Sequence, residues 1–159
     1  MCRKDRFSNI AFSAAHKSVQ RYKHGAIATK NGKVICEGHN DGMRTKVLNN
    51  YRSCAHAEMV VAVKIIKMLK KKYGKNYKNY TSKYTIWVVR KSMHNSNEKN
   101  LKMYESKPCY YCTKDLLKEG FDKIGYSNED GEIVIDRLKD IDTSKLHKSV
   151  LQLQTEEFY

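Results

Sequence analysis

The chain has 159 residues, of which 40% are hydrophobic and 30% charged, a balance that excludes a disordered chain and favours one domain over residues 1–159. Five cysteines are too few for a disulfide scaffold, which favours a reducing compartment, and we expect the cytoplasm. The sequence has neither an apolar run of transmembrane length nor a signal-peptide core, so no membrane partner is expected.

The net charge of +14 is concentrated in the middle of the chain. Residues 59–107 contain 13 Lys and Arg but only 2 Asp and Glu. One interpretation is a surface for the phosphates of a nucleotide, RNA or single-stranded DNA. The other is compositional bias, because 24 lysines outnumber 7 arginines and arginine is the better bidentate ligand of phosphate. The sequence leaves both interpretations open.

Periodicity in the first half of the chain predicts helices on either side of a hairpin. The predicted elements are a helix over 5–22, strands over 25–29 and 33–39, a loop over 38–53 and a helix over 56–70. Asn31-Gly32 lies between the two strands and is a strong signal for a two-residue hairpin turn. Lys64, Lys67 and Lys71 recur at helical steps and indicate a solvated face of the second helix.

The second half alternates strands with polar segments. The predicted elements are a loop over 71–83, a strand over 84–90, a loop over 92–107, a helix over 109–119, strands over 123–127 and 132–135, and a further helix after 137. The turn at 128–131 is too short to hold a crossover helix, so the last two strands should form an antiparallel hairpin. Together the elements predict a three-layer α/β/α fold with a mixed sheet of about five strands.

Two short motifs carry residues suited to metal chemistry. His56-Ala57-Glu58 begins the second predicted helix, and Pro108-Cys109-Tyr110-Tyr111-Cys112 begins the third. Two cysteines three positions apart share one helix face, and a helix N-terminus favours their thiolate forms. One imidazole and two thiolates are good ligands for one zinc ion and leave a fourth position for water. The alternative is a closed structural site with Cys54 as fourth ligand.

Together these motifs match the H-x-E and P-C-x-x-C signature of zinc nucleobase deaminases, and the sequence resembles the cytidine deaminase-like superfamily. The resemblance implies that His56, Cys109 and Cys112 hold one catalytic Zn²⁺ and that Glu58 is the general acid and base. It also implies hydrolytic conversion of cytosine to uracil. Relatives assemble into oligomers, so a homo-oligomer is expected by analogy.

The resemblance also suggests three residues that contact substrate. Asn40 matches an asparagine that holds substrate in the family, although beside Asp41-Gly42 it is also typical of a turn. The backbone N–H of Ala57 would help orient the attacking water. Tyr110 would stack on the base, although Tyr110 and the other aromatic residues considered for this role, Tyr111, Tyr126 and Trp87, are also typical of a core.

Three functions are compatible with these observations. The first is a cytidine- or deoxycytidylate-type deaminase acting on a cytosine nucleoside or nucleotide. The second is a deaminase of cytosine or adenine in RNA or single-stranded DNA, with tyrosines between residues 73 and 84 stacking on bases among lysines. The third is a non-catalytic zinc-binding protein, and the presence of Glu58 argues against it.

The chain departs from the family pattern in two places. Glu58 and Pro108 are separated by 49 residues, which is longer than usual in the family, and we assign the excess to lysine-rich loop insertions at about 71–83 and 92–107. The second of these leads into the zinc ligands and should border the pocket. The expected terminal hairpin resembles the branch with free-cytidine deaminases and argues against the deoxycytidylate, tRNA-adenosine and APOBEC-like members.

Overall fold

The computed structural model describes residues 1–42, 45–47, 50–52, 55–91 and 103–148. Its helices are α1 (Arg3–Ala15), α2 (Ala57–Tyr73), α3 (Lys78–Thr81) and α4 (Tyr110–Lys118), with 3-10 turns η1 (Gly74–Asn76), η2 (Leu138–Asp140) and η3 (Thr143–Lys145). Its strands are β1 (His24–Lys30), β2 (Lys33–His39), β3 (Thr45–Val47), β4 (Asn50–Arg52), β5 (Thr85–Lys91), β6 (Met103–Tyr104), β7 (Lys123–Ser127) and β8 (Ile133–Arg137). No helix within these ranges is long and apolar enough to cross a membrane.

The main sheet has the strand order β2-β1-β5-β7-β8, and the short β6 also pairs with β5. Only the β5–β7 pair is parallel, so the sheet is mixed as predicted. β7 and β8 form the predicted antiparallel hairpin. The predicted turn between β1 and β2 is also confirmed, because Asn31 and Gly32 have φ values of 52° and 76°, the left-handed backbone that a type I′ turn requires.

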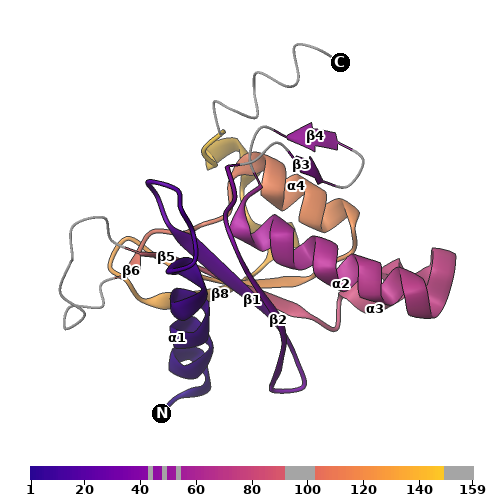
Figure 1. The fold of residues 1–159 in the computed structure, drawn as a ribbon, viewed down its shortest axis with the longest axis horizontal. Coiled ribbons are helices and arrows are strands. Elements are labelled where there is room, and N and C mark those ends of the chain that lie inside the picture. The colour runs from indigo at the N-terminus through magenta and orange to yellow at the C-terminus, as the bar shows by residue number, and fades with distance from the viewer. Residues whose placement is uncertain (43–44, 48–49, 53–54, 92–102, 149–159) are drawn as a thin grey trace.

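Helices cover both faces of the sheet, which confirms the three-layer prediction (Figure 1). On one face Phe7, Ala11 and Phe12 of α1 pack against Ile27 and Trp87. On the other face α2 and α4 pack against alternate residues of the same strands, such as Ala26, Ala28, Ile86 and Val88. Because successive side chains of β1 and β5 point to opposite faces of the sheet, this pair of strands contributes residues to two separate hydrophobic cores.

The contact between α1 and β1 depends on Gly25. A Cβ atom there would lie 1.9 Å from the carbonyl oxygen of Ala11 and 2.4 Å from the backbone nitrogen of Ala15. The backbone of α1 therefore lies directly against the backbone of β1. A residue larger than glycine at position 25 would prevent this contact.

The prediction of a loop over 71–83 is wrong, because α2 extends to Tyr73 and is followed by η1 and α3. Tertiary contacts stabilise this turn-rich sequence as helix. The rings of Tyr73 and Tyr80 stack with centroids 3.6 Å apart, and the fully buried Thr81 donates to the carbonyl of Glu119 at 2.8 Å.

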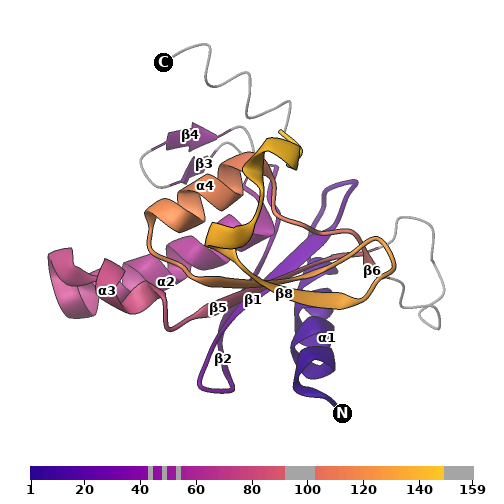
Figure 2. The ribbon, with the colours of Figure 1, turned by 180° about the vertical axis from the view of Figure 1, so that it is seen from behind.

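Four other segments differ from the sequence prediction. The first helix ends at Ala15, so residues 16–22 are not helical, and short strands β3 and β4 lie within the predicted loop 38–53. Of the loop predicted over 92–107, residues 92–102 lie outside the described residues, and Met103–Tyr104 form β6. After β8 the described chain forms η2 and η3 beside α4 in place of the predicted helix (Figure 2).

Candidate metal centre

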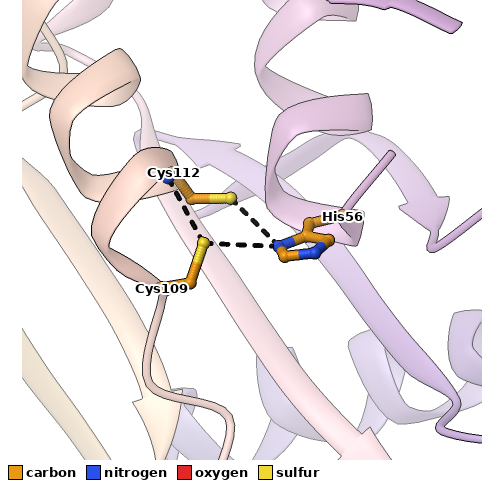
Figure 3. A group of neighbouring side chains, drawn as sticks. All are labelled: His56, Cys109 and Cys112. Carbon is orange, nitrogen blue, oxygen red and sulfur yellow. Dashed lines mark hydrogen bonds between the residues drawn. The ribbon is translucent and has the colours of Figure 1, made fainter. Parts of the chain in front are cut away.

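Three candidate ligands converge from the first turns of two helices. His56 is the N-cap of α2 and Cys109 the N-cap of α4, while Cys112 lies one turn further along α4. The Sγ atoms of Cys109 and Cys112 lie 3.5 Å and 3.2 Å from His56 Nδ1, and Figure 3 shows the three side chains pointing toward one another. Within the described residues this is the group of His, Cys, Asp or Glu side chains able to hold a metal ion.

The donor atoms fit a zinc ion in both chemistry and spacing. Imidazole nitrogens lie about 2.0–2.1 Å and thiolate sulfurs about 2.3 Å from tetrahedral zinc, which places nitrogen and sulfur about 3.5 Å apart. The observed separations of 3.2 Å and 3.5 Å are close to that value. Cys54, the alternative fourth ligand, lies outside the described residues.

The two thiols have opposite pKa shifts. A hydrogen bond from Cys112 lowers the pKa of Cys109 to about 4, assisted by the hydrogen bond and charge of His56. Burial raises the pKa of Cys112, whose side chain is fully buried. Such a pair supplies one thiolate readily, and coordination to a metal ion deprotonates the other.

Glu58 lies two residues from His56 in the first turn of α2. Its side chain is only 4% exposed, and burial raises its pKa while the charge of His56 opposes that increase. A carboxyl group with a raised pKa is suited to both accepting and returning a proton near neutral pH.

A cavity of about 670 Å³ opens beside the three ligands. Its lining includes His56, Glu58 and Cys109, together with Asn40, Tyr22 and Arg90. Pockets of roughly 300–1,000 Å³ are typical of small-molecule sites. Two of the three candidate metal ligands, His56 and Cys109, and the buried carboxyl group therefore face a space large enough for a nucleoside or nucleotide, whereas the fully buried Cys112 is not part of its lining.

The segment before Cys109 is held by a buried serine pair. Ser106 Oγ donates to the carbonyl oxygen of Val88 at 2.7 Å and lies 2.7 Å from Ser127 Oγ. Ser106 thus ties the approach to α4 to the neighbouring strands β5 and β7. Residues Glu105 to Pro108 line the cavity, so the described end of the segment predicted over 92–107 does border it.

Asn40 lines the cavity, but its side-chain amide is bound to backbone. Oδ1 accepts from the His24 N–H at 2.9 Å, and Nδ2 donates to the Tyr22 carbonyl at 2.7 Å. The structure therefore shows Asn40 holding the cavity wall at 22–24, and its contact with substrate stays a prediction.

The other two predicted substrate residues do not line the cavity. Ala57 is fully buried. Tyr110 packs edge-on against Tyr111, and the Nζ atoms of Lys114 and Lys148 lie 5.0 Å and 4.6 Å from its ring centroid. Their roles in substrate binding are untested predictions.

Among the described Phe, Tyr and Trp residues, the one that lines the cavity is Tyr22, which the sequence analysis did not select as a substrate contact. Trp87 instead packs against Phe7 on the opposite face of the sheet. Arg90 was also missed, although a charged residue at the end of the apolar strand 84–90 is a detectable signal. His24, which faces Arg90 across the β1–β5 ladder, has its pKa lowered to about 4, chiefly by burial.

A family model for the cytidine and deoxycytidylate deaminase zinc-binding region matches residues 1–128. The chain belongs to this family. The matched range contains His56, Cys109 and Cys112, and this group is consistent with a zinc site of the family. A comparison with curated protein sequences found no match.

Among solved structures, the deaminase fold is shared with a dCMP deaminase from the cyanophage S-TIM5. Its apo form is 24% identical over 79% of this chain and 82% of that chain, with a TM-score of 0.50. Its complex with dCMP and dUMP is 20% identical over 79% and 81%, with a TM-score of 0.51. The β7–β8 hairpin is the antiparallel ending that the sequence analysis expected, and the distinction from deoxycytidylate deaminases that it drew from this hairpin stays a prediction.

Proposed function

We propose that this protein is a zinc-dependent deaminase that converts cytosine to uracil in a nucleoside or nucleotide. The observation that carries the proposal is that the cluster of His56, Cys109 and Cys112 shares one cavity with the buried Glu58, through His56 and Cys109 in the cavity lining. The family match and the cyanophage enzyme's complex with dCMP and dUMP support a substrate of this class.

His56 Nδ1 and the two Sγ atoms would hold the zinc ion. Bound zinc supplies a Lewis acid that lowers the pKa of water to about 7 and so provides a nucleophile at neutral pH. Glu58 takes a proton from water and delivers it to the ring nitrogen beside the amine-bearing carbon. Once the water oxygen has bonded to the amine-bearing carbon, the carboxylate takes the remaining proton of that oxygen and gives it to the departing amine, so cytosine and water yield uracil and ammonia.

A polynucleotide substrate is less well supported by the arrangement of the lysines. Eight exposed lysines, which we call the lysine surface, lie on α2, η1, α3 and the residues after α3: Lys64, Lys67, Lys70, Lys71, Lys72, Lys75, Lys78 and Lys83. Along the chain they begin at the middle of α2 and extend beyond its C-terminal end. The metal cluster is at the opposite end of this 17-residue helix, which spans about 25 Å.

The tyrosines among these lysines are also engaged in packing. Tyr73 and Tyr80 stack on each other, Tyr77 donates to Glu119, and Tyr84 is only 5% exposed. A base-stacking surface needs ring faces that are free to receive bases. The described part of the lysine-rich middle segment therefore argues against a stacking platform that leads into the cavity.

The proposal can be tested by incubating the zinc-loaded protein with free nucleosides, nucleotides and short single strands of RNA and DNA. Mass spectrometry detects the gain of about 1 Da that accompanies replacement of the amine by oxygen. We expect turnover of cytidine, deoxycytidine or their monophosphates. Turnover of cytosine only within oligonucleotides would contradict the proposal, and so would a zinc-loaded protein that deaminates none of these compounds.

A further inference from the structure

Arg90 is a cation of the cavity wall that lacks an anionic partner. It lies near the C-terminal end of β5 and lines the same cavity as His56 and Glu58. No carboxylate of the described residues forms an ion pair with it. Its Nε is also the one buried side-chain nitrogen or oxygen atom, within the described ranges, that has no hydrogen-bond partner. A buried donor left in this way favours a ligand that brings an acceptor.

Two tyrosine rings hold the guanidinium group in place. Arg90 Cζ lies 4.8 Å from the ring centroid of Tyr22 and 5.9 Å from that of Tyr104. Cation–π contacts of this kind restrict the rotamers of the arginine. The backbone of Tyr22 is in turn held by a hydrogen bond that its carbonyl oxygen accepts from Asn40 Nδ2. Arg90 is therefore positioned before a ligand binds, which reduces the entropic cost of binding.

The surroundings of Arg90 include further cations. Arg21 Cζ lies 5.7 Å from the same Tyr22 ring, and both Arg21 and Lys107 line the cavity. The planar guanidinium group binds phosphate oxygens in a bidentate manner, whereas an uncharged nucleoside offers no anionic group.

We propose that Arg90 binds the phosphate of a nucleoside monophosphate and so makes the nucleotide, rather than the nucleoside, the substrate. This inference rests on the proposed deaminase function, because the base must reach Glu58 while the phosphate reaches Arg90. The cavity of about 670 Å³ that both residues line accommodates a ligand of this size.

The test compares Arg90→Gln with Lys91→Gln, which removes the same charge from the adjacent residue of β5 outside the cavity lining. We expect the wild-type protein to prefer dCMP or CMP over deoxycytidine or cytidine. Loss of a charge-assisted phosphate contact in Arg90→Gln should raise KM for the nucleotide by roughly 10- to 150-fold. The rise in KM should be much smaller for the nucleoside, which has no phosphate to lose contact with, and Lys91→Gln should behave as the wild type with both substrates.

A binding measurement separates this inference from the proposed function. Calorimetric titration of dUMP and deoxyuridine requires no turnover, and we expect dUMP to bind more tightly in an Arg90-dependent manner. If no compound is deaminated but this binding is observed, the proposed reaction fails and the phosphate assignment stands. Equal binding of dUMP and deoxyuridine by the wild type would overturn the assignment, as would equal weakening of both in Arg90→Gln.

Two further experiments ask whether the bound phosphate belongs to a mononucleotide or to a single strand, and provide a second variant in case Arg90→Gln does not fold. Arg90-dependent binding of a cytosine-containing single strand without binding of dUMP would overturn the mononucleotide assignment. If Arg90→Gln does not fold, Arg90→Lys replaces it, since lysine keeps the charge but loses the bidentate geometry. A smaller loss of nucleotide affinity in Arg90→Lys, with nucleoside binding intact, supports the assignment, and unaltered nucleotide affinity overturns it.

Discussion

Cys112 Sγ lies 3.2 Å from His56 Nδ1, although the two residues are 56 positions apart in the chain. The contact exists because the N-terminal ends of α2 and α4 meet on the same face of the sheet. A metal ion held there joins two helices that pack in the same core. Metal binding and folding should therefore be thermodynamically linked.

We expect the wild-type protein to contain one zinc ion per chain and Cys112→Ser to lose it. Removal of a ligand should weaken zinc binding by more than the roughly 10- to 100-fold loss seen when a residue supporting a ligand is changed. Elemental analysis after dialysis measures the metal content. Cys36→Ser is the matched control, because this half-buried thiol belongs to β2 and not to the cluster.

Because metal binding and folding are linked, the thermal stability of the same variants provides a second test. A chelator should lower the Tm of the wild type and of Cys36→Ser but leave that of Cys112→Ser unchanged. Stoichiometric zinc in Cys112→Ser, or a wild-type Tm that is insensitive to chelation, would show that the cluster is not the zinc site.

Replacement of Glu58 with Gln should abolish most turnover while zinc content is retained. The amide keeps the shape of the side chain but cannot carry the proton, so kcat should fall by roughly 10²- to 10⁴-fold. Steady-state kinetics of the zinc-loaded variant measures the loss. Glu105→Gln serves as control, since Glu105 also lines the cavity but lies outside the cluster. Full activity in Glu58→Gln would exclude the proton-transfer role.

Local sequence signals correctly predicted several elements and the placement of the two candidate metal-binding motifs at helix starts. The turn at Asn31-Gly32 and the helix-starting motifs at His56 and Cys109 depend on residues a few positions apart, which a sequence displays directly. That the two motifs lie close together was inferred from the resemblance to the family. No periodicity in the chain indicates that the N-terminal ends of α2 and α4 are neighbours.

Features set by contacts between distant residues could not be predicted in this way. Arg90 and His24 meet because β1 and β5 pair in a particular register, and nothing near either residue specifies that register. The helical turns after Tyr73 have a loop-like composition and are stabilised by the hydrogen bond from Thr81 to the distant carbonyl of Glu119, as well as by the Tyr73–Tyr80 stack. In both cases tertiary contacts override the local preference.

Replacement of Asn40 with Ala distinguishes the two roles suggested for this residue. A residue that holds the cavity wall contributes two side-chain hydrogen bonds, to His24 and Tyr22, so its loss should reduce the free energy of unfolding by about 1–3 kcal/mol. If Asn40 contacted only substrate, its replacement would raise KM without reducing stability. Urea denaturation and steady-state kinetics measure the two effects, and Asn9→Ala on the exposed face of α1 is the control. We expect lower stability in Asn40→Ala, and unchanged stability would contradict the structural role.

Replacement of Gly25 with Ala should be the most damaging single-methyl change in the sheet. The added Cβ would meet the backbone of α1 at 1.9 Å, so the helix must move away from β1 and open the core around Phe7 and Trp87. Overpacking of this kind costs about 1–3 kcal/mol or more. Gly42→Ala is the control, because its Cβ would meet only the amide end of the flexible Gln20 side chain, at 2.0 Å. Urea denaturation should show a lower midpoint for Gly25→Ala than for Gly42→Ala. Equal midpoints would mean that α1 can shift without loss of packing, and that the direct contact of its backbone with β1 does not limit stability.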